Sequence, residues 1–428
     1  MSGASIRRVR ARQVFDSRGR PTLEAEVELA NGSTGRAAVP AGASTGRHEA
    51  HELRDGDPAS YGGLGVLHAV SNVDQVLGPA VSGMDARDQR ALDARLREVD
   101  GSLGLRRLGA NAVLGVSMAV CRAGAASTGV ALYRHLAGLA GVADKPRLPL
   151  PMVNVLSGGA HARQGMDVQD FLAIPIGATC LDEALAMAAR VRTAAGNLLA
   201  QAGVSLLLAD EGGFAPGYAR AEHALDLMVR AIEAAGLRPG VDVGIGLDVA
   251  ATQFVRGDGY ALTREGRTLS SDEMVSRVLH WLDRYPIVSV EDPLGEDDWP
   301  AWQQLTRSAP AHCQLVGDDL FCTNPERIQR GISARVANAV LIKLNQIGTV
   351  SDTLSALALT RSAAYRPIVS ARSGETEDPF IADLATATAA GQIKIGSLAN
   401  SERLSKYNQL LRIQEEVGEG AFAPWTLK

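Results

Sequence analysis

The sequence predicts an α/β protein in which an α+β domain precedes a closed (β/α) barrel. From residue 150 onward, short runs rich in Val, Ile and Leu alternate with longer stretches of helical periodicity. Charged residues stand at the ends of several of these runs, as they do on the reaction face of a barrel enzyme. The main alternative is a doubly wound open sheet. That fold usually carries a phosphate-binding glycine loop after its first strand, and no such loop is present here.

The first domain begins with alternating polar and apolar residues, which predict an antiparallel meander over residues 5–40 with a turn at Asn31-Gly32. The glycine-rich stretch 40–57 is too long to be only a turn, and loops of this kind are often functional. Helical patterns follow; they cover residues 66–81, 88–100 and 111–127. Three prolines between Asp144 and Pro151 stop any helix. The predicted domains are therefore 1–143 and 144–428.

The second domain contains nine apolar runs that are typical of buried strands, and many of them are separated by helical stretches such as 180–203 and 270–285. Alternation of this length predicts parallel strands that close into a barrel. The predicted strands cover residues 151–156, 171–176, 204–210, 243–249, 286–292, 314–319, 339–345, 367–372 and 392–397.

Composition narrows the function classes. The chain has 428 residues, of which 46% are hydrophobic and only 4% aromatic, so aliphatic residues and alanine must fill its interior. A formal net charge of -5 offers no general basic surface for nucleic acid. The N-terminus has no apolar segment after its charges, and no run approaches the length of a membrane-spanning helix. We expect a soluble, cytoplasmic protein whose four cysteines are buried and reduced.

Three acidic residues end separate predicted strands: Asp248, Glu291 and Asp318. Any one of them alone would be interpreted as solvated or ion-paired. Three such residues together repel one another, and a bound cation is the simplest neutraliser. Ligation by oxygen atoms, without cysteine or histidine, favours Mg²⁺ or Mn²⁺ over zinc. The sequence therefore predicts a divalent metal site at this end of the barrel.

Two lysines occupy equivalent positions, although the chain has only five lysines among its 43 cationic residues. Lys343 and Lys394 both lie at the ends of predicted strands. Arginine cannot lose its proton, so a base position must remain lysine. Beside a divalent cation and a second ammonium group, Lys343 is a candidate base. The alternative, a structural lysine paired with Asp318, is nearly as well supported by the residues alone.

Other candidate site residues are less specific. Asp210 and Glu211 come at the end of a predicted strand and precede two glycines, so Glu211 is a candidate acid opposite Lys343; the alternative is an acidic surface turn. Arg372 and Ser373 offer a guanidinium fork and a hydroxyl that suit an anion, or else a surface salt bridge. His161, taken alone, is more typical of a packed or solvated histidine.

The chain resembles the enolase family nearly from end to end. The resemblance rests on ten segments that together are highly specific: VFDSRGRPTLEAEVEL, GASTGRHEAHELRDGD, LGANAVLGVSMAV, DEGGFAP, LDVAA, EDP, GDDLFCTN, LIKLNQIG, RSGETED and SERLSKYNQLLRI. It implies a (β/α)8 enolase-type barrel preceded by an α+β capping domain. It also implies an Mg²⁺-dependent hydro-lyase that interconverts 2-phosphoglycerate and phosphoenolpyruvate, and assembly as a homodimer or an octamer of dimers.

The resemblance also implies roles for single residues. Asp248, Glu291 and Asp318 correspond to the ligands of a first Mg²⁺, and Ser44 to a ligand of a second Mg²⁺. Lys343 corresponds to the base that removes the C2 proton, and Glu211 to the acid that assists departure of the C3 hydroxyl. The implied substrate contacts are Lys394 with the carboxylate, Arg372 and Ser373 with the phosphoryl group, and His161, Gln169 and Asp170 in the pocket wall. Glu24 and Arg412 correspond to a pair that crosses the dimer interface.

Several positions depart from the family pattern. Ala371 stands where enolases have histidine, Asp170 where they have glutamate, and Ser157 where they have asparagine; Ala41 and Leu64 also depart. The first two changes remove side-chain volume and a titratable ring. Three hypotheses follow: an ordinary enolase, a paralogue that acts on a bulkier 2-phosphoglycerate analogue, such as a carboxyphosphonoenolpyruvate synthase of phosphonate antibiotic biosynthesis, and a non-catalytic binding protein.

Overall fold

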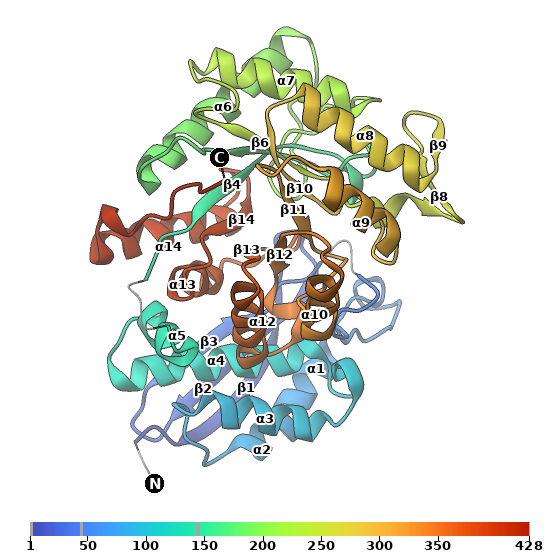
Figure 1. The fold of residues 1–428 in the computed structure, drawn as a ribbon. Helices are drawn as coiled ribbons and strands as arrows, with labels where there is room; N and C mark the ends of the chain where they lie inside the picture. Colours follow the sequence, from blue (N-terminus) through green and yellow to red (C-terminus); the bar gives the residue numbers. More distant parts are fainter. Residues whose placement is uncertain (1–2, 43–45, 143–145, 428) are drawn as a thin grey trace.

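The computed structural model describes residues 3–42, 46–142 and 146–427. Two of the positions predicted above, Ser44 and the boundary between residues 143 and 144, lie outside the described residues. The chain builds an N-terminal α+β part at the bottom of Figure 1 and an α/β barrel above it.

The N-terminal part begins with the predicted antiparallel meander, whose strands pair in the order β1-β2-β3. The alternation of β2 explains its two faces: Leu23, Ala25, Val27 and Leu29 are buried, and the glutamates between them face outward. Helix α4 packs on β2 and β3. A Cβ atom added at Gly35 in β3 would lie only 2.1 Å from the carbonyl oxygen of Ala119 in α4, so glycine is required there. The elements are β1 (Ile6–Phe15), β2 (Pro21–Leu29), β3 (Thr34–Ala38), α1 (Leu67–Asn72), a π-helical turn (Val73–Leu77), α2 (Gly78–Val81), α3 (Gln89–Asp100), α4 (Ala110–Thr128) and α5 (Leu132–Ala140).

The barrel closes in the order β10-β11-β12-β13-β14-β4-β5-β6. Apart from the half-buried Arg366, every residue of these strands is buried, which explains why their sequences are nearly continuous apolar runs. The strands are β4 (Leu150–Ser157), β5 (Asp170–Ile174), β6 (Gly244–Asp248), β10 (Ile287–Glu291), β11 (Gln314–Gly317), β12 (Ala339–Ile342), β13 (Arg366–Ser370) and β14 (Gln392–Gly396).

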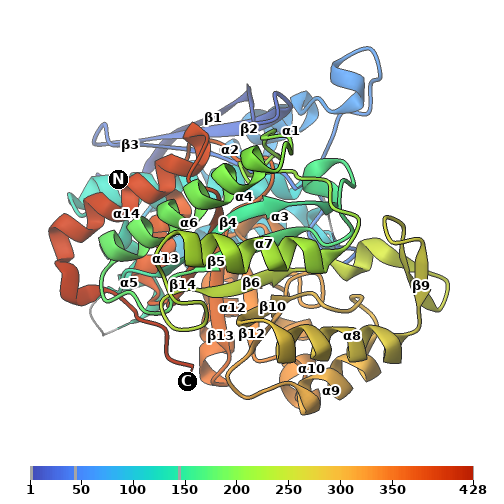
Figure 2. The ribbon, with the colours of Figure 1, turned by 90° about the horizontal axis from the view of Figure 1, so that it is seen from above.

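Helices surround the barrel, and Figure 2 shows α6, α7 and α14 along one side of it. Helices α6 and α7 pack on each other and on β4 and β5, whereas α12 packs on β12 and β13. Helices α3 and α4 join the two parts of the chain: Ser117 and Asp93 accept the backbone N–H groups of Val350 and Ser351 at 3.0 and 2.9 Å. The helices are α6 (Leu181–Gln201), α7 (Ala221–Ala234), α8 (Ser271–Arg284), α9 (Trp299–Ser308), α10 (Pro325–Ala334), α11 (Leu344–Ile347), α12 (Val350–Ser362), α13 (Phe380–Ala387) and α14 (Ser401–Val417). A small sheet is formed by β7 (Val255–Arg256), β8 (Gly259–Leu262) and β9 (Arg267–Leu269).

Two details of the predicted barrel were wrong. Strand β5 runs antiparallel to both β4 and β6, because the connection 158–169 contains only a short 3₁₀ turn and no crossover helix. The run 204–210 forms no strand: Leu208 makes only an isolated bridge to Phe214, and Leu206, Leu207 and Leu208 are 46%, 73% and 44% exposed. The other eight predicted runs already close the barrel, so a ninth strand has no edge to join.

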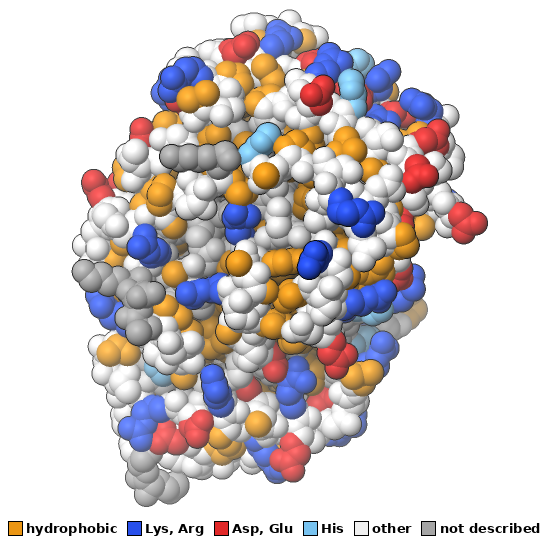
Figure 3. Space-filling model, viewed as in Figure 1, with side chains coloured by type: hydrophobic (Ala, Val, Ile, Leu, Met, Phe, Trp, Pro, Cys, Tyr) orange, Lys and Arg blue, Asp and Glu red, His pale blue; other side chains and the backbone are white. Residues whose placement is uncertain are grey.

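Within the described ranges, no single helix is long and apolar enough to cross a membrane. Helices α4 and α5 together reach that length and composition, but they meet at 107° and most of α4 is buried in the core. On the face seen in Figure 3, cationic and anionic side chains are both spread among apolar ones. The three buried cysteines match expectation, whereas Cys180 is only half-buried; all four are free.

Candidate active site and metal centre

Most of the predicted acids and lysines meet at the barrel mouth because neighbouring parallel strands end at one edge. Glu291 ends β10 opposite Asp248, which ends β6. Asp318 and Lys343 directly follow β11 and β12, the next two strands around the barrel. Lys394 projects from β14, and its Nζ donates to Asp248 Oδ2 and Glu291 Oε2 at 2.7 Å each. Lys343 Nζ donates to Asp318 Oδ2 at 2.5 Å.

Four of these side chains are buried and Lys343 is nearly so, with 12% of its side chain exposed; their electrostatics show a shortage of positive charge. Three carboxylates face two ammonium groups, which leaves one negative charge uncompensated within this set. Burial, and then the charge of Asp248, raise the pKa of Glu291 well above its usual value. Burial alone would raise the pKa of Asp318, but the ammonium group of Lys343 lowers it below its usual value.

The donor set fits a hard divalent cation. Among the described residues, Glu291 Oε1 is one of the few buried polar atoms without a hydrogen-bond partner. A buried carboxylate oxygen of this kind is costly unless it binds a partner. All three carboxylates offer oxygen ligands, which Mg²⁺ prefers. The pKa of Lys343 also depends on these carboxylates. Burial lowers it, but the charges of Asp318 and Glu291 outweigh burial, so the net pKa of Lys343 is raised. A cation on those carboxylates would oppose this increase.

A second buried group joins Asp170, His161 and Glu211, whose ligand-type atoms all lie within 4.8 Å of one another. His161 Nδ1 lies 2.8 Å from Asp170 Oδ2, and His161 Nε2 lies 3.7 Å from Glu211 Oε1. Burial opposes a charge on the imidazole, but Asp170 and Glu211 outweigh it and raise the pKa of His161 to about 9. The pKa of Glu211 is lowered despite its burial, chiefly by His161. His161 thus lies between two carboxylates that favour its protonated form.

This arrangement predicts a pH dependence of stability. A histidine whose pKa is raised from about 6.5 in the unfolded chain to about 9 stabilises the fold fully below pH 6.5 and loses that contribution as the pH rises through 9. We expect His161→Gln to destabilise the protein by about 1.5–3 kcal/mol at pH 6 and by much less at pH 9.5. Urea unfolding of both proteins across this range checks it. A difference between them that stays constant with pH would contradict a protonated His161.

The reversed strand β5 explains how Gln169 and Asp170 reach the mouth although they lie at the start of their strand and not at its end. Asp170 pairs in register with Asp248, because the start of an antiparallel strand lies beside the end of its neighbour. Gln169 Nε2 donates to Asp248 Oδ2 at 3.0 Å. Glu211 also lies at the barrel mouth, although the strand predicted before it does not form. It lies in a turn, and its backbone carbonyl accepts the N–H of Ser397 at 2.9 Å.

Arg372 and Ser373 follow β13 at the same end of the barrel. The guanidinium of Arg372 donates to Glu49 and to Asn345 Oδ1, the latter at 2.9 Å. The hydroxyl of Ser373 lies 3.5 Å from a terminal nitrogen of Arg18, at the limit of a hydrogen bond. Two arginines therefore approach this position, which suits an anion. The salt bridge that the sequence left open as the alternative is present, but it is buried and not on the surface.

Sequence reasoning missed several residues that hold the site in place. Gln346 Nε2 donates to Asp318 Oδ1 at 2.9 Å, and Asp292 accepts the N–H groups of Asp318 and Asp319 at 3.0 and 2.7 Å. Asn154 Nδ2 donates to Asp170 Oδ1 at 2.6 Å. Asn154 carried a usable signal, because it is a polar residue within an otherwise apolar strand.

The comparisons with known proteins agree with this arrangement. A family model described as "Enolase, C-terminal TIM barrel domain" matches residues 145–424, and one described as "Enolase, N-terminal domain" matches residues 6–136. A protein named enolase from Mycobacteroides abscessus is 52% identical over 417 residues, which cover 97% of this chain and 95% of that relative. The chain belongs to the enolase family. Enolases are hydro-lyases, so the chain is a carbon–oxygen lyase.

Two of the departures from the enolase pattern contact each other. Ser157 Oγ donates to Asp170 Oδ1 at 2.8 Å, so the shortened carboxylate and the small hydroxyl residue form one buried hydrogen-bonded unit. Together with Asn154 and His161, Ser157 turns the Asp170 carboxylate toward these three side chains. Ala371 follows β13 directly, and its N–H donates to the carbonyl of Lys394 at 2.9 Å. It therefore places only a methyl group where enolases have an imidazole.

Proposed function

We propose that this chain is an Mg²⁺-dependent hydro-lyase that removes water from 2-phosphoglycerate to give phosphoenolpyruvate. The observation that carries this proposal is the barrel mouth, where Lys343 lies beside the oxygen cluster of Asp248, Glu291 and Asp318 in a chain 52% identical to an enolase. Two Mg²⁺ ions per site are expected from the family, and bound there they would stabilise the charge that develops on the substrate carboxylate. Ser44, the expected ligand of the second ion, lies outside the described residues.

The first step, removal of the C2 proton, requires a base and positive charge that compensates the charge developing on the substrate. A proton next to a carboxylate is very weakly acidic, since its removal adds negative charge to a group that is already anionic. Lys343 takes the C2 proton, and the bonding electron pair moves toward the carboxylate. Lys394, buried among acids that hold it protonated, faces that carboxylate and supports the added charge.

The second step expels the C3 hydroxyl. The electron pair forms the C2–C3 double bond, the C3–O bond breaks, and the oxygen leaves as water after it accepts a proton. Glu211 is the proposed acid, and the protonated His161 beside it is the proton source. Arg372 and Ser373 hold the phosphoryl group, and Gln169 and Asp170 complete the pocket wall.

A second candidate function rests on one observation, that two buried side chains at the barrel mouth, Ala371 and Asp170, are shorter than their counterparts in enolases. The proposed metal ligands and Lys343 are retained, whereas two side chains of the pocket wall are smaller than in enolases, which leaves more space, and one of the two has lost its titratable ring. Such a site suits a bulkier analogue of 2-phosphoglycerate, as in carboxyphosphonoenolpyruvate formation. The same base and the same metal ligands would serve both substrates.

The test is the formation of phosphoenolpyruvate from 2-phosphoglycerate with Mg²⁺, followed by ultraviolet absorbance. Turnover in the usual range of about 1–10³ s⁻¹ supports the first candidate. Negligible turnover with continued exchange of the C2 proton for solvent deuterium supports the second. Absence of both reactions would contradict the two candidates together and would indicate a non-catalytic protein.

Ala371→His separates the two candidates further. If the pocket has been remodelled for another substrate, this change should raise turnover of 2-phosphoglycerate by about 10-fold or more, because it restores volume and a proton-transferring ring. Steady-state kinetics measures the effect, and Ala371→Phe is the matched control because it restores volume without a titratable group. Unchanged or lower activity of Ala371→His would count against remodelling.

Assembly, pathway and location remain predictions. We propose a homodimer or an octamer of dimers in the cytoplasm, serving either glycolysis or phosphonate biosynthesis. Glu24 and Arg412 are the expected interface pair. Within one chain, Glu24 already pairs with Arg12 and lies 3.5 Å from Arg36, while Arg412 is exposed on α14. Arg412 is therefore in a position from which a second copy could be reached, whereas Glu24 would first have to leave its partners within the chain.

A further inference from the structure

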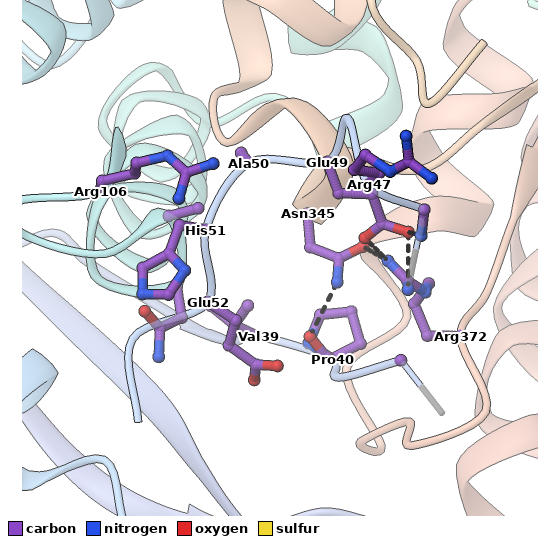
Figure 4. A pocket seen from close by; sticks show the side chains of 14 residues that line it. Val39, Pro40, Arg47, Glu49, Ala50, His51, Glu52, Arg106, Asn345 and Arg372 are labelled. Atoms are coloured by element: carbon purple, nitrogen blue, oxygen red, sulfur yellow. Dashed lines mark hydrogen bonds and ion pairs between the residues drawn. The ribbon is translucent and has the colours of Figure 1, made fainter. Parts of the chain in front are cut away.

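The guanidinium of Arg372 forms a salt bridge with an acidic side chain of the protein itself. Glu49, from the N-terminal part of the chain, accepts from both terminal nitrogens: Arg372 Nη1 lies 3.0 Å from Oε2, and Nη2 lies 3.3 Å from Oε1. The two side chains are only 8% and 3% exposed. Figure 4 shows this pair at one side of a cavity, with Asn345 beside it.

Further hydrogen bonds hold both Glu49 and Arg372 in place. Glu49 Oε1 also accepts the backbone N–H of Gly46 at 3.0 Å and lies 3.4 Å from Gln346 Nε2, which itself donates to Asp318. Asn345 accepts from Arg372 Nη1 at 2.9 Å and donates to the carbonyl of Pro40 at 3.3 Å. A buried guanidinium is costly without an anion, and Glu49 supplies one from the chain itself.

A carboxylate and a phosphoryl group present the same feature to arginine, namely two oxygens that match the guanidinium fork. Glu49 and a ligand phosphoryl group therefore need the same nitrogens. We propose that Glu49 is an internal anion that competes with the ligand for Arg372 and so sets the affinity of the site for tetrahedral oxyanions. This inference rests on the proposed role of Arg372 in holding the phosphoryl group.

A cavity beside the pair offers space for the Glu49 carboxylate once a ligand displaces it. A cavity of about 310 Å³ adjoins the pair; Arg106 and His51 lie on its far side in Figure 4, and Asn111 and Arg47 also line it. Glu49 can therefore turn away from Arg372 into a space that two other arginines, Arg47 and Arg106, line. Exchange of anions on Arg372 does not require a buried carboxylate to remain without a cationic neighbour.

The competition also selects ligands by charge. A phosphoryl dianion brings two negative charges to Arg372, whereas Glu49 brings one, so the dianion displaces it with a net electrostatic gain. A ligand with a single carboxylate offers no such advantage. Glu49 is accordingly a specificity-determining residue that excludes monoanions from the site.

Inorganic phosphate is the probe, titrated into metal-free full-length protein by isothermal calorimetry. We expect Glu49→Gln to bind phosphate about tenfold more tightly than the wild type, which corresponds to about 1.4 kcal/mol. Glu52→Gln is the matched control, because Glu52 lines the same cavity but pairs with Arg54 at 2.7 Å; its affinity should stay within about twofold of wild type. Equal or weaker binding by Glu49→Gln, or equal tightening in both variants, would overturn the proposal.

Two further variants keep the test decisive. Glu49→Asp keeps the charge and shortens the side chain, so it should bind phosphate with intermediate affinity; it decides the question if Glu49→Gln does not fold. Arg372→Gln should abolish the binding, and phosphate that still binds would place the anion elsewhere and overturn the proposal. Turnover of 2-phosphoglycerate is measured separately. If the wild type does not turn over 2-phosphoglycerate but Glu49→Gln binds phosphate more tightly, the proposed function fails and this inference stands. If the wild type turns over 2-phosphoglycerate but Glu49→Gln does not bind phosphate more tightly, only this inference fails.

Discussion

Lys343→Arg should lower turnover by about 10³-fold, within the range of about 10²–10⁴ that general base catalysis contributes. Arginine keeps the positive charge beside Asp318, but it cannot lose its proton. The variant should therefore keep its stability while it loses both product formation and exchange of the C2 proton. Ultraviolet absorbance and nuclear magnetic resonance in deuterated buffer measure the two losses.

The same substitution at another buried lysine is the control. Lys406 on α14 pairs with Glu375 at 2.9 Å and donates to the backbone carbonyl of Glu402 at 2.7 Å. Lys406→Arg should retain C2 exchange, because it changes packing and not the base. Full exchange by Lys343→Arg would show that Lys343 is the structural partner of Asp318, the alternative that its sequence position left open.

Glu291→Gln should separate metal binding from folding. We expect the affinity for Mg²⁺ to fall by about 10²-fold or more and turnover to fall with it, because one of three anionic ligands is lost. The metal-free variant should be as stable as the wild type or more stable, because burial and the charge of Asp248 already disfavour the ionised form of Glu291.

Thermal unfolding with and without Mg²⁺ measures both effects. At an Mg²⁺ concentration 100-fold above its Kd, the wild type should gain about 2.7 kcal/mol, and the variant should lose most of this gain. Glu222→Gln, at a carboxylate of α7 that pairs with Arg277 at 3.2 Å, should keep the full gain. An unchanged Mg²⁺ effect in Glu291→Gln would place the metal on other residues, such as the cluster of Asp292, Asp318 and Asp319.

The strand-end acids and lysines show how far sequence periodicity reaches. Asp248, Glu291, Asp318 and Lys343 were predictable as neighbours, because each follows or ends a buried run and parallel strands end at one edge. Glu211 was predicted for the wrong reason: its run of leucines forms an exposed loop, and tertiary contacts with β4 and Ser397 bring it to the mouth. An apolar run indicates a strand only when a sheet edge is free to receive it.

Glu49 shows what periodicity cannot indicate. It lies in an irregular loop, and its partner Arg372 is 323 residues away in the chain. Likewise, Ser157 and Asp170 looked like two separate departures from the enolase pattern, and only their 2.8 Å hydrogen bond shows that they form one unit. Contacts of this kind depend on side-chain directions, which no local pattern encodes.

The sequence by itself determined the two-part architecture, the barrel class, the family resemblance and the chemical types gathered at the strand ends, because these follow from local periodicity and residue type. Only the tertiary structure decided the reversal of β5, the placement of Glu211, the bridge of His161 between two carboxylates and the pairing of Glu49 with Arg372. The physical reason is that charge balance in a buried site depends on distances between groups far apart in the chain. Those distances exist only after the barrel has closed.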